Sequence, residues 1–359
     1  MNSSFRIIPF YPIGKLLLIC IQNGGVEVKK IPIFFLFLFR YFIFEPFRLA
    51  QIIFYDRKIM NHQMHEDPIF ILGHWRSGTT YLQELLSCNV NHTTTSVYQF
   101  LFIDHFLITE KWLVSPFNFV CRILKIPYSF QRVQMDLNMP GEMESAMCSG
   151  LSKYSYTWGH IFPKRYWFWF EKMIELEDMN DINGWLDDYD YLIRKISYSS
   201  GGKRVVVKSP GDTGRAKYLM KKYPNAKFIF INREPISVYH STMYFWNIIQ
   251  KEVSFQHVNN NQLHQFCINS YVYLLNNYNS FREEIPSNQL FELNFQDLIS
   301  DPIFVLKSLY SNLNMGEFPE EQIQKKISTK RPNSKGLFHT SLELANEIHE
   351  KWEKPFIRI

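Results

Sequence analysis

Residues 68–88 read PIFILGHWRSGTTYLQELLSC. The first six residues form a short apolar run that ends in glycine, which is typical of a buried strand. Residues 80–88 have the pattern of a helix. Backbone N–H groups at the start of a helix are unpaired and carry partial positive charge, so they bind anions. The stretch therefore predicts a phosphate-binding turn at residues 73–80, between a buried strand and a helix.

This turn differs from the loop of nucleoside triphosphatases, which reads G-x-x-x-x-G-K-[ST]. Gly73 and Gly78 have the spacing of that loop, but Thr79 stands where its lysine would be, and Arg76 lies inside the turn. No apolar run ending in Asp offers a partner for Mg²⁺. We therefore expect an anion held by arginine, hydroxyl and backbone groups, and no metal.

Strand and helix patterns alternate from residue 68 to residue 314, which predicts an α/β fold. We expect a three-layer, P-loop-like architecture with a mainly parallel sheet flanked by helices. Further strands are expected at residues 204–208, 227–232 and 289–293, and further helices at residues 215–223, 235–250, 263–282 and 301–314. Residues 89–200 lack clear strand signals and are expected to add helices and loops above the carboxyl edge of the sheet.

Two more polar groups follow predicted strands. Lys208 ends one strand, and Arg233 ends the next, with Ser241 about two helical turns into the following helix. Ligands of such folds bind at the carboxyl edge of the sheet. An arginine fork with a hydroxyl suits a phosphate. Taken alone, Arg233 also fits a surface ion pair, and Lys208 also fits a lysine whose stem is buried and whose head reaches water.

Together these residues resemble the sulfotransferase family that uses 3′-phosphoadenosine 5′-phosphosulfate (PAPS), over about residues 68–314. The RSGTT element is closest to the broad branch found in bacteria and some eukaryotes, and residues 292–302 are similar to a late element of the family. The resemblance implies a 3′-phosphate site at Arg233 and Ser241 and places Lys208 near the sulfuryl group. It also implies a 5′-phosphosulfate loop made of Arg76, Ser77, Gly78, Thr79 and Thr80.

The sequence departs from the cytosolic aryl and steroid sulfotransferases at the general base. Their catalytic histidine is replaced by Pro210, so the base must lie elsewhere. The branch resembled here often carries a Pro-x-Glu-x-Glu segment, which supplies Glu142 and Glu144 as candidates. Glu144 is slightly favoured, Asp212 is a further candidate, and both glutamates also fit solvated surface charges. Arg76 and Lys208 are expected to stabilise the charge of the transition state.

The N-terminal region is apolar and basic. Residues 1–58 hold eight basic and three acidic residues, which accounts for the whole net charge of +5. The densest apolar run, residues 31–44, is shorter than the roughly 20 residues of a spanning helix and contains Pro32 and Arg40. Two interpretations stay open: a segment at the membrane interface, or helices that cover the catalytic domain or line an acceptor pocket. The expected organisation is a helical extension at 1–66 and a sulfotransferase-like domain at 67–359.

Charge balance and cysteine spacing exclude some classes of protein. Beyond residue 58 basic and acidic residues balance, so no nucleic-acid-binding stripe is expected. The five cysteines are dispersed, which indicates reduced thiols. We expect a cytoplasmic protein, with peripheral membrane contact through residues 1–58 as an open question.

The resemblance implies an enzyme that moves a sulfuryl group from PAPS, its cosubstrate, to a hydroxyl or amine by in-line displacement. The acceptor is expected to be a small molecule, a lipid or a carbohydrate, and the apolar N-terminus favours a lipid-like or membrane-presented one. One alternative is a catalytically silent, membrane-associated nucleotide-binding protein of the same fold. A P-loop kinase is a further alternative, which the missing loop lysine disfavours.

Overall fold

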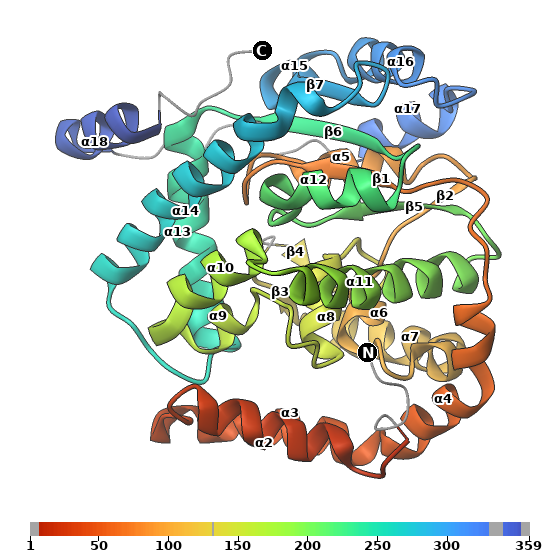
Figure 1. The fold of residues 1–359 in the computed structure, drawn as a ribbon, viewed down its shortest axis with the longest axis vertical. Helices are drawn as coiled ribbons and strands as arrows, with labels where there is room; N and C mark the ends of the chain where they lie inside the picture. Colours follow the sequence, from red (N-terminus) through yellow and green to blue (C-terminus); the bar gives the residue numbers. More distant parts are fainter. Residues whose placement is uncertain (1–6, 131–132, 330–339, 353–359) are drawn as a thin grey trace. The chain divides into compact units, whose positions relative to one another are not determined.

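The computed structural model describes residues 7–130, 133–329 and 340–352, and the chain divides into two compact units (Figure 1). Each unit is built from three separate stretches of sequence. Unit 1 comprises Met1–Gln63, Thr95–Ser199 and Phe245–Leu263. Unit 2 comprises Met64–Thr94, Ser200–Tyr244 and His264–Ile359.

Unit 2 is organised around a parallel five-stranded sheet with the strand order β2-β5-β1-β6-β7. The apolar strand β1 lies at the centre and pairs with β5 on one side and β6 on the other. The strands are β1 (Ile69–Leu72), β2 (His92–Thr93), β5 (Arg204–Lys208), β6 (Lys227–Asn232) and β7 (Leu290–Asn294). The predicted α/β class with a mainly parallel sheet is confirmed.

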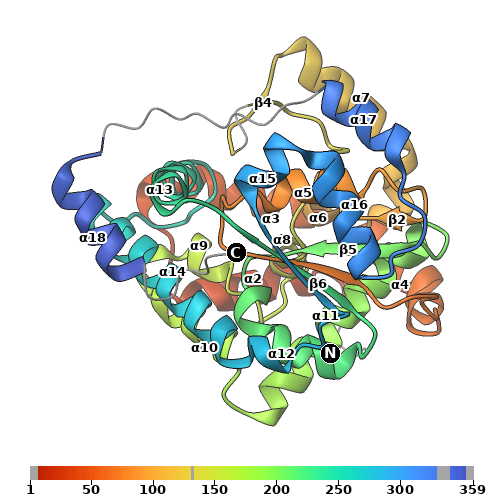
Figure 2. The ribbon, with the colours of Figure 1, turned by 90° about the horizontal axis from the view of Figure 1, so that it is seen from above.

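Helices cover both faces of this sheet, so a strand such as β1 is buried on both sides (Figure 2). Alternate residues of β1 point to opposite faces. Ile69 and Ile71 pack in one apolar cluster with side chains of α5, α15 and α16. On the other face Phe70 meets the ring of Tyr223, which follows α12, and Phe230 stacks on Tyr278 of α14.

Four helices of unit 2 agree with the sequence pattern: α5 (Thr79–Leu86), α12 (Asp212–Lys222), α16 (Pro302–Asn312) and most of α14 (Asn260–Phe281). The sequence analysis did not predict α15 (Phe295–Ser300), α17 (Glu320–Thr329), α18 (Leu342–Trp352) or the short η3 (Arg282–Glu284). The helix α13 (Pro235–Glu252) begins in unit 2 and ends in unit 1. The sequence did not reveal β2, because a two-residue strand carries no measurable alternation.

Unit 1 is mainly helical. Its helices are α2 (Tyr11–Gln22), η1 (Val28–Lys30), α3 (Ile31–Ile43), α4 (Glu45–Met60), α6 (Val97–Leu101), α7 (Phe106–Ile123), α8 (Met143–Ser149), α9 (Trp158–Ile161), η2 (Pro163–Arg165), α10 (Tyr166–Glu175) and α11 (Met179–Ser199). A short antiparallel pair, β3 (Pro127–Tyr128) and β4 (Val133–Gln134), completes it.

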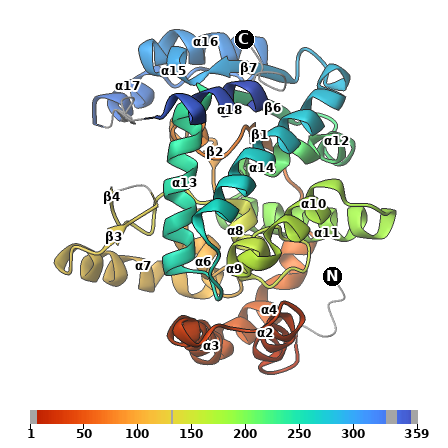
Figure 3. The ribbon, with the colours of Figure 1, turned by 90° about the vertical axis from the view of Figure 1, so that its left-hand side faces the viewer.

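The N-terminal helices α2 and α3 lie side by side in unit 1 (Figure 3). Both place one side in the same apolar cluster, through Leu16 and Ile19 of α2 and Tyr41 of α3. The Tyr41 hydroxyl donates to the Ser149 carbonyl at 2.8 Å, which fixes the end of α3 against α8. Across the described ranges 7–130, 133–329 and 340–352, no helix has both the length and the apolar character needed to cross a membrane.

The position of β6 between β1 and β7 predicts that truncating one of its core side chains has a large effect on stability. Ile229 is fully buried in the cluster beneath α5 and α16. Ile229→Ala should lower the free energy of unfolding by about 2–5 kcal/mol, because it removes buried methyl groups and leaves a cavity. Chemical denaturation measures this loss. The control is Phe304→Ala on α16, where the ring is 68% exposed; equal effects of the two variants would contradict the assignment of this core.

Candidate active site

The turn from β1 to α5 is held in a shape that only glycine permits at two positions. Gly73 has a φ of 137° and Gly78 a φ of 105°, both in the region that side chains disfavour. A Cβ on Gly73 would lie 2.6 Å from the Ile231 carbonyl oxygen, and one on Gly78 would lie 2.2 Å from the Phe295 ring. The turn is thus packed directly against β6 and α15. The helix α5 starts at Thr79, so its unpaired N-terminal N–H groups lie at the end of this turn.

Inside the turn, Ser77 and His74 stabilise the backbone. The Ser77 side chain donates to the His74 carbonyl at 2.7 Å, and both residues are buried. Burial lowers the pKa of His74 to about 3, so its imidazole is neutral near pH 7. Ser77 therefore serves the shape of the turn in this structure.

Arg76, Arg233 and Ser241 lie together, although the sequence assigned them to two different phosphate sites. The Arg76 Nε donates to the Ser241 hydroxyl at 2.9 Å, and an Arg233 terminal nitrogen donates to the Arg76 carbonyl at 3.1 Å. The Arg233 guanidinium lies 4.5 Å from the centre of the Phe295 ring. Burial lowers the pKa of Arg233, because desolvation disfavours the charged guanidinium.

Lys208 ends β5 at the same edge of the sheet. The register pairs Lys208 with Ile71, two residues before Gly73, and the lysine is 4% exposed. The next residue, Ser209, is fully buried, and its hydroxyl has no hydrogen-bond partner among the described residues. Three neighbouring strands thus bring Lys208, the turn and Arg233 to one edge, where cations and helix N–H groups together suit an anion.

Two supporting residues were not singled out from the sequence. Thr213 accepts a hydrogen bond from the Gly73 N–H at 2.7 Å and so links the turn to α12. Phe295 contacts both Gly78 and Arg233. Phe295 lies within residues 292–302, whose resemblance to a family element was the only available signal. A single Thr or Phe in a sequence does not by itself indicate a tertiary contact of this kind.

Asp212, a candidate base from the sequence, forms a buried ion pair. Its Oδ1 lies 2.9 Å from an Arg215 terminal nitrogen, and both side chains are at most 1% exposed. The two residues are one turn apart in the first turn of α12. This pairing gives Asp212 a structural role in the first turn of α12.

Glu142 and Glu144 both belong to unit 1. Glu142 is the residue before α8 and is half-buried, whereas Glu144 in the first turn of α8 is fully buried. The Glu144 Oε1 accepts a hydrogen bond from the Tyr156 N–H at 2.9 Å. The two carboxylates therefore have different surroundings, and Glu144 is not the solvated surface charge that the sequence left open.

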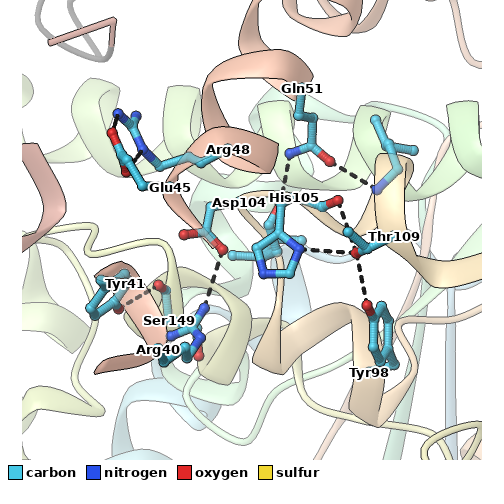
Figure 4. Close-up of polar contacts among 12 residues, drawn as sticks. Arg40, Tyr41, Glu45, Arg48, Gln51, Tyr98, Asp104, His105, Thr109 and Ser149 are labelled. Atoms are coloured by element: carbon cyan, nitrogen blue, oxygen red, sulfur yellow. Dashed lines mark hydrogen bonds and ion pairs between the residues drawn. The ribbon is translucent and has the colours of Figure 1, made fainter. Parts of the chain in front are cut away.

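Unit 1 also contains a cavity of about 80 Å³ between α2, α3, α4, α8 and α11. Several charged groups in or beside its wall are paired with each other, as Figure 4 shows for Arg48 with Glu45 and for Arg40 with Asp104. Its apolar wall includes Tyr11, Tyr41, Ile52, Ile103, Met147 and Leu192. The cavity is suited to a mainly apolar group.

Comparison with known proteins identifies the family. Residues 68–320 match the model of a family described as the sulfotransferase family. The chain is also 31% identical over 273 residues to the omega-hydroxy-beta-dihydromenaquinone-9 sulfotransferase Stf3 of Mycobacterium tuberculosis, covering 75% of this chain and 68% of that protein. The Stf3 protein of Mycobacterium bovis gives the same figures.

Two solved structures share the fold. Sulfotransferase STF1 of Mycobacterium tuberculosis has a TM-score of 0.68 at 17% identity, over 95% of this chain and 91% of that one. Sulfotransferase STF9 of Mycobacterium avium has a TM-score of 0.68 at 16% identity, over 87% of this chain and 82% of that one. At these identities the likeness concerns the fold alone.

The buried pair in α12 predicts a test of the role of Asp212. Asp212→Ala should destabilise the protein by about 3 kcal/mol, because the Arg215 charge stays buried without its carboxylate. The double variant Asp212→Leu, Arg215→Met should recover much of that loss and retain sulfuryl transfer. Thermal unfolding and turnover measure the two effects. A double variant that is stable but inactive would show that Asp212 takes part in the chemistry.

Proposed function

This chain belongs to the sulfotransferase family, and we propose that its sulfuryl donor is PAPS, held at the carboxyl edge of β5, β1 and β6. The chain is an enzyme that transfers a sulfuryl group to an acceptor. The observation that carries the choice of donor is the cluster of Arg76, Arg233 and Ser241 beside the N-terminus of α5. A donor with phosphates at both its 5′ and 3′ positions would use both parts of this cluster.

The residues of the site fit the chemistry of such a donor. We assign the 5′-phosphosulfate to Arg76, Ser77, Gly78, Thr79 and Thr80, and the 3′-phosphate to Arg233 and Ser241. The half-buried Arg233 is planar and always charged, which suits a phosphate better than a lysine does. Its stacking on Phe295 holds the guanidinium in place before a ligand arrives. Such preorganisation lowers the entropic cost of binding.

The proposed reaction is an in-line displacement at sulfur. The acceptor oxygen forms a bond to sulfur while the bond from sulfur to the 5′-phosphate oxygen breaks, and the bisphosphate nucleotide leaves. By analogy with phosphoryl transfer, positioning and electrostatic stabilisation supply most of the acceleration. We assign the stabilisation of negative charge on the sulfuryl and leaving oxygens to Arg76 and Lys208, with the N-terminus of α5.

The acceptor hydroxyl must lose its proton. We propose that Glu144 takes it, with Glu142 as the second candidate. Glu144 is protected from solvent and is held by the Tyr156 N–H, so its position is defined. A base needs this kind of fixed placement within hydrogen-bond reach of the proton.

For the acceptor we propose a lipid-like molecule presented by a membrane, with residues 89–200 on the acceptor side and residues 1–58 in peripheral contact with the bilayer. Three observations support this. The name of the relative Stf3 states a menaquinone derivative as its substrate. The cavity of unit 1 is largely apolar. The N-terminal helices expose apolar side chains.

Thermal unfolding with 3′-phosphoadenosine 5′-phosphate, and separately with ATP, each with and without Mg²⁺, tests the donor. A ligand at about 100 times its dissociation constant adds roughly 2.7 kcal/mol of stability. We expect the bisphosphate to stabilise the protein without metal. Stabilisation by ATP with Mg²⁺ alone would favour the kinase, and no stabilisation by either would favour the silent binding protein.

Arg233→Ala should weaken binding of the same bisphosphate by about 2–3 kcal/mol, because it removes a charged hydrogen bond to a phosphate. Isothermal titration measures the affinity. The control is Lys227→Ala at the opposite end of β6, where the lysine donates to the Asn288 carbonyl. Unchanged affinity in Arg233→Ala would remove this residue from the site.

Glu144→Gln should lower turnover by about 100-fold, the ordinary contribution of a general base. It should leave nucleotide affinity unchanged, because glutamine keeps an oxygen that accepts from the Tyr156 N–H. Steady-state kinetics and titration separate the two effects, with Glu142→Gln as the matched variant. Full activity in Glu144→Gln together with a loss in Glu142→Gln would assign the base to Glu142.

A further inference from the structure

The outer side of α3 is apolar, although its inner side already supplies the core contacts. The rings of Phe34 and Phe37 both meet the buried ring of Phe255, at 5.6 and 5.3 Å between centroids. Phe35 and Phe39, one turn apart, are directed away from this contact and are 60% and 59% exposed. An outer helix face normally carries polar residues, so packing within this unit does not explain these two side chains.

The neighbouring helix α2 extends the same surface. Its buried residues Leu16 and Ile19 lie in the same apolar cluster as the inner side of α3. Because α2 and α3 lie side by side on one cluster, their opposite sides face outward together (Figure 3). We call this outward surface the docking face; its most prominent members are Leu18, Ile21, Phe35, Leu36, Phe39 and Phe42.

The N-terminal end of α2 is fixed to the C-terminal end of α3. Phe10 stacks on Phe42 with ring centroids 5.6 Å apart, and the Phe10 N–H donates to the Glu45 carboxylate at 2.7 Å. Arg48 pairs with that carboxylate and also donates to the Ile8 carbonyl at 3.0 Å. The docking face is therefore a fixed part of unit 1.

The charge around the docking face is positive. Over residues 7–44 the sequence holds Lys15, Lys29, Lys30 and Arg40. Arg40 is paired with Asp104, and the single acidic residue of this stretch, Glu27, is paired with Lys164 at 2.7 Å. Lys29 is exposed at the turn between the two helices. A second copy of this surface would bring like charges together, whereas an anionic lipid surface would complement them.

We propose that the docking face binds a bilayer that contains anionic lipids, with α2 and α3 lying in the plane of the interface. Phe and Leu side chains would enter the boundary between headgroups and acyl chains, and the lysines would contact the phosphates. The helix α3 has 13 residues, too few to span the hydrocarbon core. The purpose of this membrane contact would be access to a lipid-like acceptor. In this respect the proposal rests on the proposed function, which it deepens.

Vesicle co-sedimentation of the full chain tests the proposal, with phosphatidylcholine vesicles that contain or lack phosphatidylglycerol. We expect binding that requires phosphatidylglycerol and weakens with salt. Replacing Phe35 and Phe39 with serine should weaken partitioning by about tenfold for each ring removed. Phe304→Ser is the matched control, because that ring is 68% exposed on α16 of unit 2. Lys29→Glu should weaken binding to the vesicles that contain phosphatidylglycerol, because it replaces an exposed positive charge with a negative one.

Two results would overturn the proposal. One is vesicle binding that is absent in the wild type or unchanged in Phe35→Ser, Phe39→Ser. The other is a dimer, seen by light scattering, that the same double variant dissociates, since the occupant would then be a second copy. Stabilisation by 3′-phosphoadenosine 5′-phosphate is measured in every variant: its retention shows that the fold is intact. Vesicle binding without any nucleotide effect in the wild type would refute the donor assignment and leave the docking face standing.

Discussion

No side chain fits at Gly73 or Gly78, and this restriction sets the geometry of the proposed donor site. The positive φ angles and the contacts with the Ile231 carbonyl and the Phe295 ring force the chain to turn directly from the central strand into α5. The N-terminus of α5 consequently lies at the carboxyl edge of the sheet, where β5 and β6 also end. A bulkier turn would move the unpaired N–H groups of α5 away from Lys208 and Arg233.

The same edge concentrates positive charge before any ligand is present. Arg76 and Arg233 are held close to each other through the Ser241 hydroxyl, the Arg76 carbonyl and the face of Phe295. Burial lowers the pKa of Arg233, because desolvation disfavours the charged form. An anionic ligand at this edge would stabilise both guanidinium groups, which supports the proposal of a donor with two phosphate positions.

In unit 1, apolar side chains are both buried in the core and exposed at the surface. Its helix α3 uses phenylalanines on both sides, the inner ones in the core around Phe255 and the outer ones on the docking face. The two interpretations of the N-terminus that the sequence left open are therefore compatible, because one side of the helix covers a core while the other is available to an interface. The buried Glu144 on α8 and the cavity among α2, α3 and α4 belong to this unit as well.

The sequence by itself determined the α/β class, the positions of β1, β5, β6 and β7 and the family, because apolar runs, glycine spacing and strand-end residues are local patterns. It could not show β2, which is too short to carry a pattern. Only the tertiary structure decided that Arg76 contacts Ser241, that Phe295 supports Arg233, and that Asp212 is paired with Arg215 in a buried position. These contacts depend on how strands and helices pack, and residues 165 positions apart leave no mark of their contact in one sequence.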